Sequence, residues 1–217
     1  MFIHRAVYQT RVFINRLLEQ LRLFHNAKTM PVSSDMKKDL SWLLKFLEQY
    51  NGTCSYRMFP LAQAEQVELD ASLQGFGGVF GSQVYMLDLN EIYVPGCMHI
   101  THLEMWNVLV AVRLWGSQWR DKYVCIKCDN EAVVSIINTG SSRDIILSAL
   151  IRNIVLQMSM HNFQLKVVHI PGVKNKTADL LSRWNSTVSP QEKLQRLVEQ
   201  PLWCKIEKSF LVIDLDM

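Results

Sequence analysis

The sequence predicts a mixed α/β fold, in which a five-stranded mixed sheet is flanked by helices and preceded by a helical appendage. Two observations predict this fold. Between residues 66 and 96, apolar and polar residues alternate with a period close to that of a strand, and glycines separate three short runs. After that stretch, segments with helical periodicity alternate with two short β-branched runs.

The helical appendage is predicted to occupy residues 1–60. Apolar residues recur at helical spacing from Arg5 to Ala27, which predicts a first helix. A second helix is predicted to follow the N-cap residues Ser33-Ser34-Asp35 and to end at Asn51-Gly52. We expect residues 61–186 to form the principal domain and residues 187–217 to form a C-terminal tail.

The elements of the principal domain are predicted in the order β-β-β-α-β-α-α-β-α. The runs VELDASL, GFGGVFGSQVYML and EIYVPG are predicted to be three consecutive antiparallel strands. A helix from Thr101 to Trp119, the strand KYVCIKCD and two further helices follow, and the strand QLKVVHI leads into a helix that begins near Lys174. In the tail, QEKLQRLVEQ has helical spacing and FLVIDLDM is predicted to be extended.

Composition excludes a membrane protein and indicates the cellular compartment. No apolar stretch approaches the roughly 18 residues that a spanning helix needs, and the N-terminus lacks the pattern of a secretory signal. The five cysteines are an odd number in unrelated settings, which predicts free thiols in a reducing compartment, the cytoplasm or the nucleus. The net charge of +3 is too small to indicate a nucleic-acid partner by itself.

Four acidic residues occupy positions that suit a shared cation site. Asp70 ends the first predicted strand, Glu104 lies in the first turn of the next helix, Asp129 ends the fourth strand and Asp179 lies in the last helix. If the first and fourth strands are neighbours, Asp70 and Asp129 emerge side by side. Carboxylates this close repel one another unless cations neutralise them, and their hard oxygen atoms suit Mg²⁺ or Mn²⁺. Two such ions could drive hydrolysis of a phosphodiester.

Each acid also has a purely structural interpretation. Thr101-x-x-Glu104 matches a capping box, so Glu104 could satisfy a helix start. Asp70 could be a turn residue, Asp129 an N-cap, and Asp179 a solvated helical position. Each structural interpretation is adequate for one acid alone, but the order of all four along the predicted elements favours the cation site.

Four segments of the sequence resemble the ribonuclease H domains of reverse transcriptases. ELDASLQGFGGVF resembles the first-strand motif, HITHLEMWNVLVAV the helix with the glutamate, CIKCDNEAVVSIINTG the strand and helix with Asp-Asn, and HIPGVKNKTADLLSRW the closing motif. Asn-x-x-Ala-Asp and Leu-Ser-Arg-Trp are most similar to DIRS-type, tyrosine-recombinase retrotransposons. KKDLSWLLKFLEQYNG resembles their connector between polymerase and ribonuclease H, and no polymerase motif is present.

The resemblance implies a ribonuclease H that cuts the RNA strand of RNA/DNA hybrids with two Mg²⁺ or Mn²⁺ ions. It implies Asp70, Glu104, Asp129 and Asp179 as metal ligands and catalytic residues. Family members often place a histidine near the last acid, which makes His169 a candidate for proton transfer or product release, although a strand-end packing role fits it as well. The N-terminal helices are expected to contact a missing polymerase part or another protein.

Polar residues around the helix junctions are candidates for substrate contact, because short polar side chains can bind 2′-hydroxyls and phosphates. The candidates are Asn130, Ser141, Arg143 and Asn175. An ordinary polar turn explains the first three equally well, and Asn175 could instead order the loop before Asp179. Two alternative functions remain: a catalytically inactive module that binds nucleic acid or protein, and an integrase or transposase of the same fold.

Overall fold

The computed structural model describes residues 31–49, 60–91, 99–186 and 189–211, together with single positions between 12 and 29. The predicted first helix, Arg5 to Ala27, therefore lies almost entirely outside the described residues, although the described positions between 12 and 22 are helical. The strands are β1 (Glu65–Ala71), β2 (Gly75–Phe80), β3 (Gln83–Asp88), β4 (Tyr123–Cys128), β5 (Gln164–His169) and β6 (Leu202–Trp203). The helices are α3 (Ser34–Gln49), α4 (Ile100–Trp115), α5 (Glu131–Thr139), α6 (Ile145–His161), α7 (Lys176–Ser182) and α8 (Pro190–Leu197).

The strands form one mixed sheet in the order β5-β4-β1-β2-β3-β6. β1, β2 and β3 pair antiparallel, whereas β4 pairs parallel with β1 and β5 pairs parallel with β4. The predicted mixed α/β fold and the adjacency of the first and fourth strands are therefore confirmed. The predicted number of strands is wrong by one, because the short β6 adds to the edge of β3.

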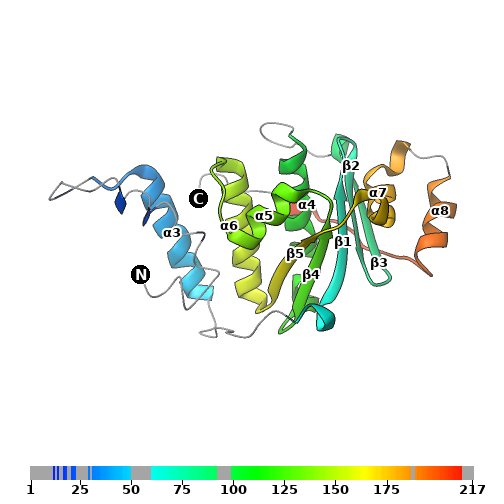
Figure 1. The fold of residues 1–217 in the computed structure, drawn as a ribbon, viewed down its shortest axis with the longest axis horizontal. Coiled ribbons are helices and arrows are strands. Elements are labelled where there is room, and N and C mark those ends of the chain that lie inside the picture. The colour runs from blue at the N-terminus through cyan, green and yellow to red at the C-terminus, as the bar shows by residue number, and fades with distance from the viewer. Residues whose placement is uncertain are drawn as a thin grey trace.

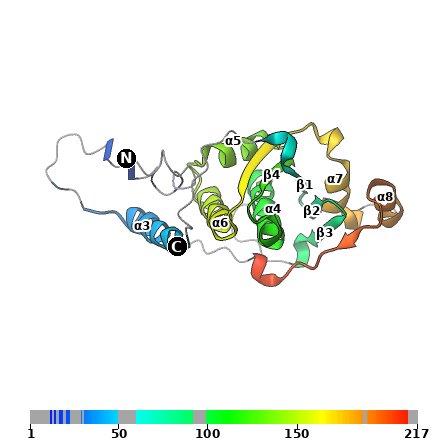
Figure 2. The ribbon, with the colours of Figure 1, turned by 90° about the horizontal axis from the view of Figure 1, so that it is seen from below.

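The helices cover both faces of this sheet (Figures 1 and 2). α4 and α6 lie on one face, and α7 and α8 lie on the other. α4 is buried along almost its whole length, because the sheet covers one side of it and α6 covers another. This explains why its sequence is apolar nearly all round rather than amphipathic. The predicted helix end at Trp119 is a short 3₁₀ turn, Gly116–Trp119, that continues α4.

The appendage helix α3 packs against α6 and belongs to the same apolar core (Figure 1). Trp42 and Phe46 are 1% and 0% exposed. An ion pair of 2.5 Å joins Asp39 of α3 to Arg152 of α6, and both side chains are buried. Breaking one side of such a pair leaves an uncompensated buried charge, so this contact fixes the position of α3 on the helical face.

The C-terminal stretch returns to the sheet after α7. α8 confirms the helical spacing of QEKLQRLVEQ, and β6 follows it. The extended conformation predicted for FLVIDLDM is wrong at its start, because Lys208–Leu211 form a 3₁₀ turn, and residues 212–217 lie outside the described part. Within the described ranges, no helix has the length and apolarity to cross a bilayer.

Candidate active site

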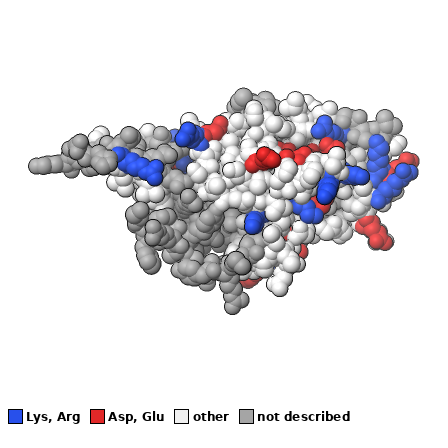
Figure 3. All heavy atoms as spheres, viewed as in Figure 1, with Lys and Arg blue, Asp and Glu red and all other residues white. Residues whose placement is uncertain are grey.

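An open cleft of about 820 Å³ lies at the carboxyl ends of β1 and β4. Glu68 of β1 pairs in register with Lys127 of β4, so Asp70 and Asp129, each two residues further on, are also at the same level. Both line the cleft, and Glu104 joins them from α4. Acidic residues gather near the upper middle of the surface in Figure 3. Parallel pairing thus brings together carboxylates from distant parts of the chain.

Glu104 faces the sheet from the first turns of α4. It is 3% exposed, and its Oε1 atom accepts a hydrogen bond of 3.3 Å from the Ala71 amide of β1. The N-cap of α4 is His99, whose ring accepts from the Thr101 amide, so the capping-box interpretation of Glu104 is wrong. Burial, and then the charge of Asp70, raises the pKa of Glu104 to about 9. Glu104 is therefore oriented toward the neighbouring acids and not toward its own helix end.

Asp70 is the most connected of the acids. It is 4% exposed, and burial raises its pKa to about 6. The hydroxyl of Ser182 donates a hydrogen bond of 2.5 Å to Asp70 Oδ2, which opposes that increase, and the charges of Asp129 and Asp179 add to it. The turn interpretation of Asp70 is wrong, because the residue lies inside β1 and pairs with Gly77. Burial is thus the main cause of the raised pKa, and the neighbouring negative charges add to it.

Glycine in β2 allows α7 to approach the sheet closely. A Cβ on Gly77 would lie 2.3 Å from the Ala178 carbonyl oxygen of α7, so no larger residue fits there without a shift. Ser182 at the end of α7 consequently reaches both Asp70 and, through its own carbonyl, the hydroxyl of Ser72 at 2.7 Å. The predicted hairpin glycines thus have a second role, which is to seat the helix that bears Asp179.

Asp179 lies beside the cleft but does not line it. Its side chain is 48% exposed, and its Oδ1 atom accepts from Arg183 Nε at 2.7 Å, one helical turn later. Asp179 is nevertheless close enough to Asp70 for its charge to raise the pKa of that carboxyl. The structure therefore gathers three of the four predicted acids around one cleft and places the fourth at its edge, paired with a guanidinium.

The donor set fits a hard divalent cation. Among the described residues, one group of potential ligands has atoms that all lie within 4.8 Å of one another: Glu104, Cys128 and Asp129. Burial and the charge of Glu104 raise the pKa of the Cys128 thiol, and a soft sulfur atom is a poor donor for Mg²⁺ or Mn²⁺. The remaining donors are carboxylate oxygens, with Asp70 alongside. Burial, and after it the repulsion between the acids, raises the pKa values of Asp70 and Glu104, and a cation would relieve that repulsion.

The other predicted residues occupy varied positions. His169 ends β5 as an exposed residue in register with Cys128. Ser141 and Arg143 are exposed in the turn before α6. Asn130 lines the cleft, but its Oδ1 atom accepts from two amides as the N-cap of α5, so Asp129 is not the cap. Asn175 is 0% exposed and donates to the Leu69 carbonyl at 2.8 Å, which agrees with its loop-ordering interpretation.

Three further residues were not predicted as part of this site. Asn107 of α4 donates to the Asp70 and Gly77 carbonyls at 2.7 and 3.0 Å, and so holds the backbone beneath the acid. Its side-chain oxygen accepts from the Tyr85 hydroxyl at 2.5 Å. Asn107 lies three residues after Glu104 in an apolar helix, and this isolated polar residue was the available sequence indication. Ser182 and Arg183 stand in the recognised Leu-Ser-Arg-Trp motif, but the motif did not reveal their contacts.

Sequence comparison identifies part of the chain. Residues 82–185 match the family model described as reverse transcriptase-like. Glu104, Asp129 and Asp179 lie inside this segment, whereas Asp70 precedes it. A search of curated proteins found no match. Among solved structures, RNase H1 from the halophilic archaeon Halobacterium salinarum aligns with a TM-score of 0.42 and 13% identity, over 57% of this chain and 99% of that one. The segment from residue 82 to residue 185 is therefore similar in sequence to reverse transcriptase-like proteins.

Proposed function

We propose that this chain is a ribonuclease H-type endonuclease that hydrolyses the RNA strand of RNA/DNA hybrids with the help of divalent cations. The observation that supports this most directly is the convergence of Asp70, Glu104 and Asp129 from three separate elements on one open cleft. Burial combined with mutual repulsion raises the pKa of both Asp70 and Glu104. Such a cluster is typical of a functional site whose negative charge a bound ligand neutralises.

The proposed cations are two Mg²⁺ or Mn²⁺ ions, held by Asp70, Glu104, Asp129 and Asp179. Such ions supply Lewis acidity that lowers the pKa of water and stabilises a leaving oxygen. The chain itself positions the acids. Ser182 and Asn107 fix the side chain and the backbone of Asp70, and the Ala71 amide orients Glu104. Asp179 would complete the set from α7 by exchanging its contact with Arg183.

The reverse transcriptase-like match supports the proposed reaction class and a retroelement origin. The motif resemblance to DIRS-type retrotransposons specifies that origin further, with the N-terminal helices as the former connector to a polymerase. The three described cysteines Cys125, Cys128 and Cys204 are free thiols, which is consistent with a cytoplasmic or nuclear location.

Contacts to the substrate are proposed for exposed residues near the cleft. Arg143 and Ser141 stand in the turn before α6, where they could reach phosphates or 2′-hydroxyls. Asn130 lines the cleft and caps α5 with its side-chain oxygen, so it would contact the substrate through its side-chain amide nitrogen. We retain His169 as a candidate for product release, because its exposed ring follows β5 close to Asp129 in the sheet.

The proposal is tested with the full chain and a hybrid labelled on the RNA strand. The wild-type protein should cleave the RNA strand in Mg²⁺, and cleavage should stop when EDTA is added. The cleavage rate of Asp129→Asn should be lower by several orders of magnitude. Glu199→Gln is a matched control, because it neutralises an exposed carboxylate that does not line the cleft. If the wild-type protein binds the hybrid but leaves it intact, the chain is an inactive binding module instead. Cleavage of duplex DNA would indicate the integrase or transposase alternative.

Cation binding has its own measurement. A ligand that binds only the folded chain stabilises it by RT ln(1 + [L]/Kd), about 2.7 kcal/mol at a hundredfold excess over Kd. Mg²⁺ should therefore raise the melting temperature of wild type, and Asp129→Asn should reduce the increase. If the two proteins show the same increase, the carboxylate cluster does not hold the ion.

A further inference from the structure

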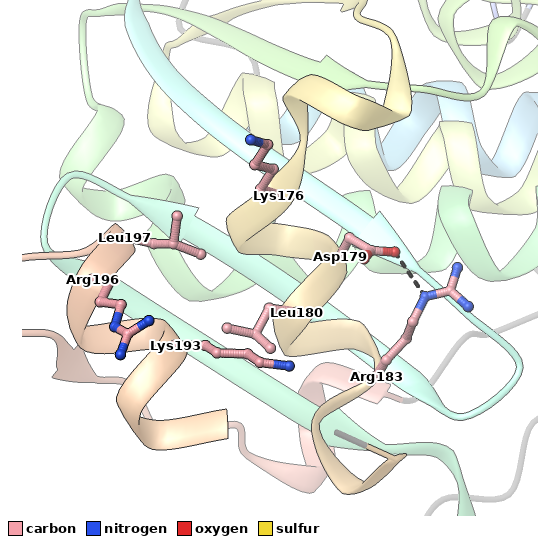
Figure 4. Close-up of a pocket in the computed structure, with 7 residues that line it drawn as sticks. All are labelled: Lys176, Asp179, Leu180, Arg183, Lys193, Arg196 and Leu197. Carbon is pink, nitrogen blue, oxygen red and sulfur yellow. Dashed lines mark hydrogen bonds and ion pairs between the residues drawn. The ribbon is translucent and has the colours of Figure 1, made fainter. Parts of the chain in front are cut away.

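A second concavity, of about 410 Å³, lies between α7 and α8 and is lined mainly by basic side chains (Figure 4). Lys176 and Arg183 enter it from α7, and Lys193 and Arg196 enter it from α8. Leu180 and Leu197 provide its apolar lining. The only carboxylate among its described lining residues is Asp179, which is already paired with Arg183. We call this concavity the basic groove.

Three of the four cations of the basic groove have no acidic partner among the described residues, whereas Arg183 is paired with Asp179. Within the part of the chain that the structure describes, Lys176, Lys193 and Arg196 have no carboxylate within 4.0 Å. In Figure 3, blue side chains gather over α7 and α8, with red side chains beside them. Positive side chains that share a hollow repel one another, and an anionic ligand removes that repulsion. The basic groove therefore has the charge of an anion-binding site.

The basic groove is a fixed part of the fold, because α8 is anchored on both sides. Leu194 and Val198, 1% and 7% exposed, pack in one cluster with Leu180 and Leu181 of α7 and Val84 of β3. The chain then continues into β6, which pairs parallel with β3. Lys193 and Arg196 are exposed on the same helix whose other face is buried, so they project from a rigid support. Preorganised cations lose less entropy when they bind.

The basic groove directly adjoins the acid cleft, which is the cleft lined by Asp70, Glu104 and Asp129. Arg183 lines both concavities. Its Nε atom donates to Asp179 Oδ1 at 2.7 Å, so the guanidinium stands at the border between the acids and the basic groove. A polyanion that passes from the acid cleft over Arg183 would enter the basic groove.

We propose that the basic groove binds the phosphate backbone of the nucleic acid whose scissile phosphate lies in the acid cleft. This rests on the proposed function for the identity of the strand. Lysine and arginine are the usual partners of phosphate, and such contacts give affinity without base specificity. Two of the four cations come from α8, which lies beyond residues 82–185, so this site extends past the reverse transcriptase-like segment.

The test compares two double variants in the Asp129→Asn background, so that the hybrid stays intact. Lys193→Ala/Arg196→Ala removes the α8 contribution, and Lys205→Ala/Lys208→Ala removes the same charge from exposed positions outside both concavities. Binding of a fluorescent RNA/DNA hybrid is measured by anisotropy between 50 and 200 mM salt. The groove variant should bind roughly two- to thirtyfold more weakly, as expected for two exposed ion pairs. The slope of log K against log[salt] should become shallower by about 1.8, since each phosphate contact contributes about 0.9.

Three results would overturn the basic groove as a phosphate site. They are an unchanged affinity and salt slope, an equal change in the control variant, and a groove variant that loses affinity for a poly-glutamate peptide while it keeps that for the hybrid. The far-ultraviolet circular dichroism and melting temperature of both variants verify folding, which exposed truncations should leave unchanged. Failure of the proposed nuclease looks different: wild type would not cleave the hybrid, yet the groove variant would still bind it more weakly than the control.

Discussion

Replacing Gly77 with alanine tests whether the close seating of α7 on β2 assembles the acids. The added Cβ would lie 2.3 Å from the Ala178 carbonyl oxygen and 2.6 Å from the Ser182 amide nitrogen. Both are backbone atoms of α7, so no side-chain rotation removes the clash. Restoring an ordinary contact of 3.4 Å to the Ala178 oxygen requires a movement of 1.1 Å. α7 therefore has to move away from the sheet.

The expected losses of stability and of activity follow from that movement. Overpacking of a well-filled site costs about 1–3 kcal/mol, a substantial part of the 5–15 kcal/mol typical of a domain. The shift also lengthens the bond from Ser182 to Asp70 and carries Asp179 away from the other acids. Since misplacement of a functional group by about 1 Å can lower a rate by about 10²-fold, hybrid cleavage by Gly77→Ala should fall by that order.

The assay combines guanidinium unfolding, followed by tryptophan fluorescence, with hybrid cleavage under conditions where the variant is folded. Trp106, Trp115 and Trp119 are buried, so their fluorescence reports on the core. Gly81→Ala is the matched control. Gly81 has φ +59° and no atom within 4 Å of an added Cβ, so alanine should cost roughly 1–2 kcal/mol through its backbone alone. Activity lost equally in both variants, or unchanged activity in Gly77→Ala, would refute the seating argument.

Three further predictions concern the acids and the helical face. Burial raises the pKa of Glu104 from 4.5 to about 9, so the folded chain binds this proton more tightly than the unfolded chain does. Without metal, the free energy of unfolding should therefore fall as pH rises from about 4.5 to about 9, and urea titrations in EDTA should show a flatter dependence for Glu104→Gln. In Gly172→Ala the new Cβ would lie 2.9 Å from Asp129 Oδ2, which is the mobile end of a side chain. Hybrid cleavage should drop while the melting temperature stays near that of wild type; a large loss of stability would contradict this. Arg152→Ala removes the cation that pairs with the buried Asp39 carboxylate and should cost about 3–5 kcal/mol in denaturant, more than the double variant with Asp39→Ala. Equal losses in the two would show that the buried charge is not the cause.

Local patterns in the sequence were sufficient for most elements. Alternation between residues 66 and 96 predicted three strands, but the structure divides the second predicted run, GFGGVFGSQVYML, into β2 and β3. The third predicted run, EIYVPG, begins in a 3₁₀ turn at Glu91, and its residues 92–96 lie outside the described residues. The two helices predicted after the strand KYVCIKCD are confirmed as α5 and α6, although the N-caps are Asn130 and Asp144 and not Asp129. Such patterns succeed because periodicity and capping depend on neighbours within one or two turns. β6 was missed because a two-residue strand has no periodicity of its own and depends on β3 for pairing.

The arrangement of the site was less accessible from the sequence. The capping box at Thr101 and Glu104 was a reasonable local interpretation, yet Glu104 bonds to Ala71 of β1. Nothing local distinguishes a glutamate that turns back to its own helix from one that faces a sheet, because only the position of the strand decides it. The ion pair between Asp179 and Arg183, in contrast, can be read from local sequence. The two residues are four positions apart in a predicted helix, and this spacing brings their side chains together.

The sequence by itself determined the mixed α/β fold, the order of its elements and the four acids, because each is encoded in short-range periodicity or in a motif. Only the tertiary structure decided that Asp70, Glu104 and Asp129 line one cleft and that Gly77 allows α7 to lie close to β2. Only the tertiary structure decided, too, that α8 of the predicted C-terminal tail lines the basic groove. These features depend on contacts between residues far apart in the chain. Packing and strand register set those contacts, and no local pattern contains either.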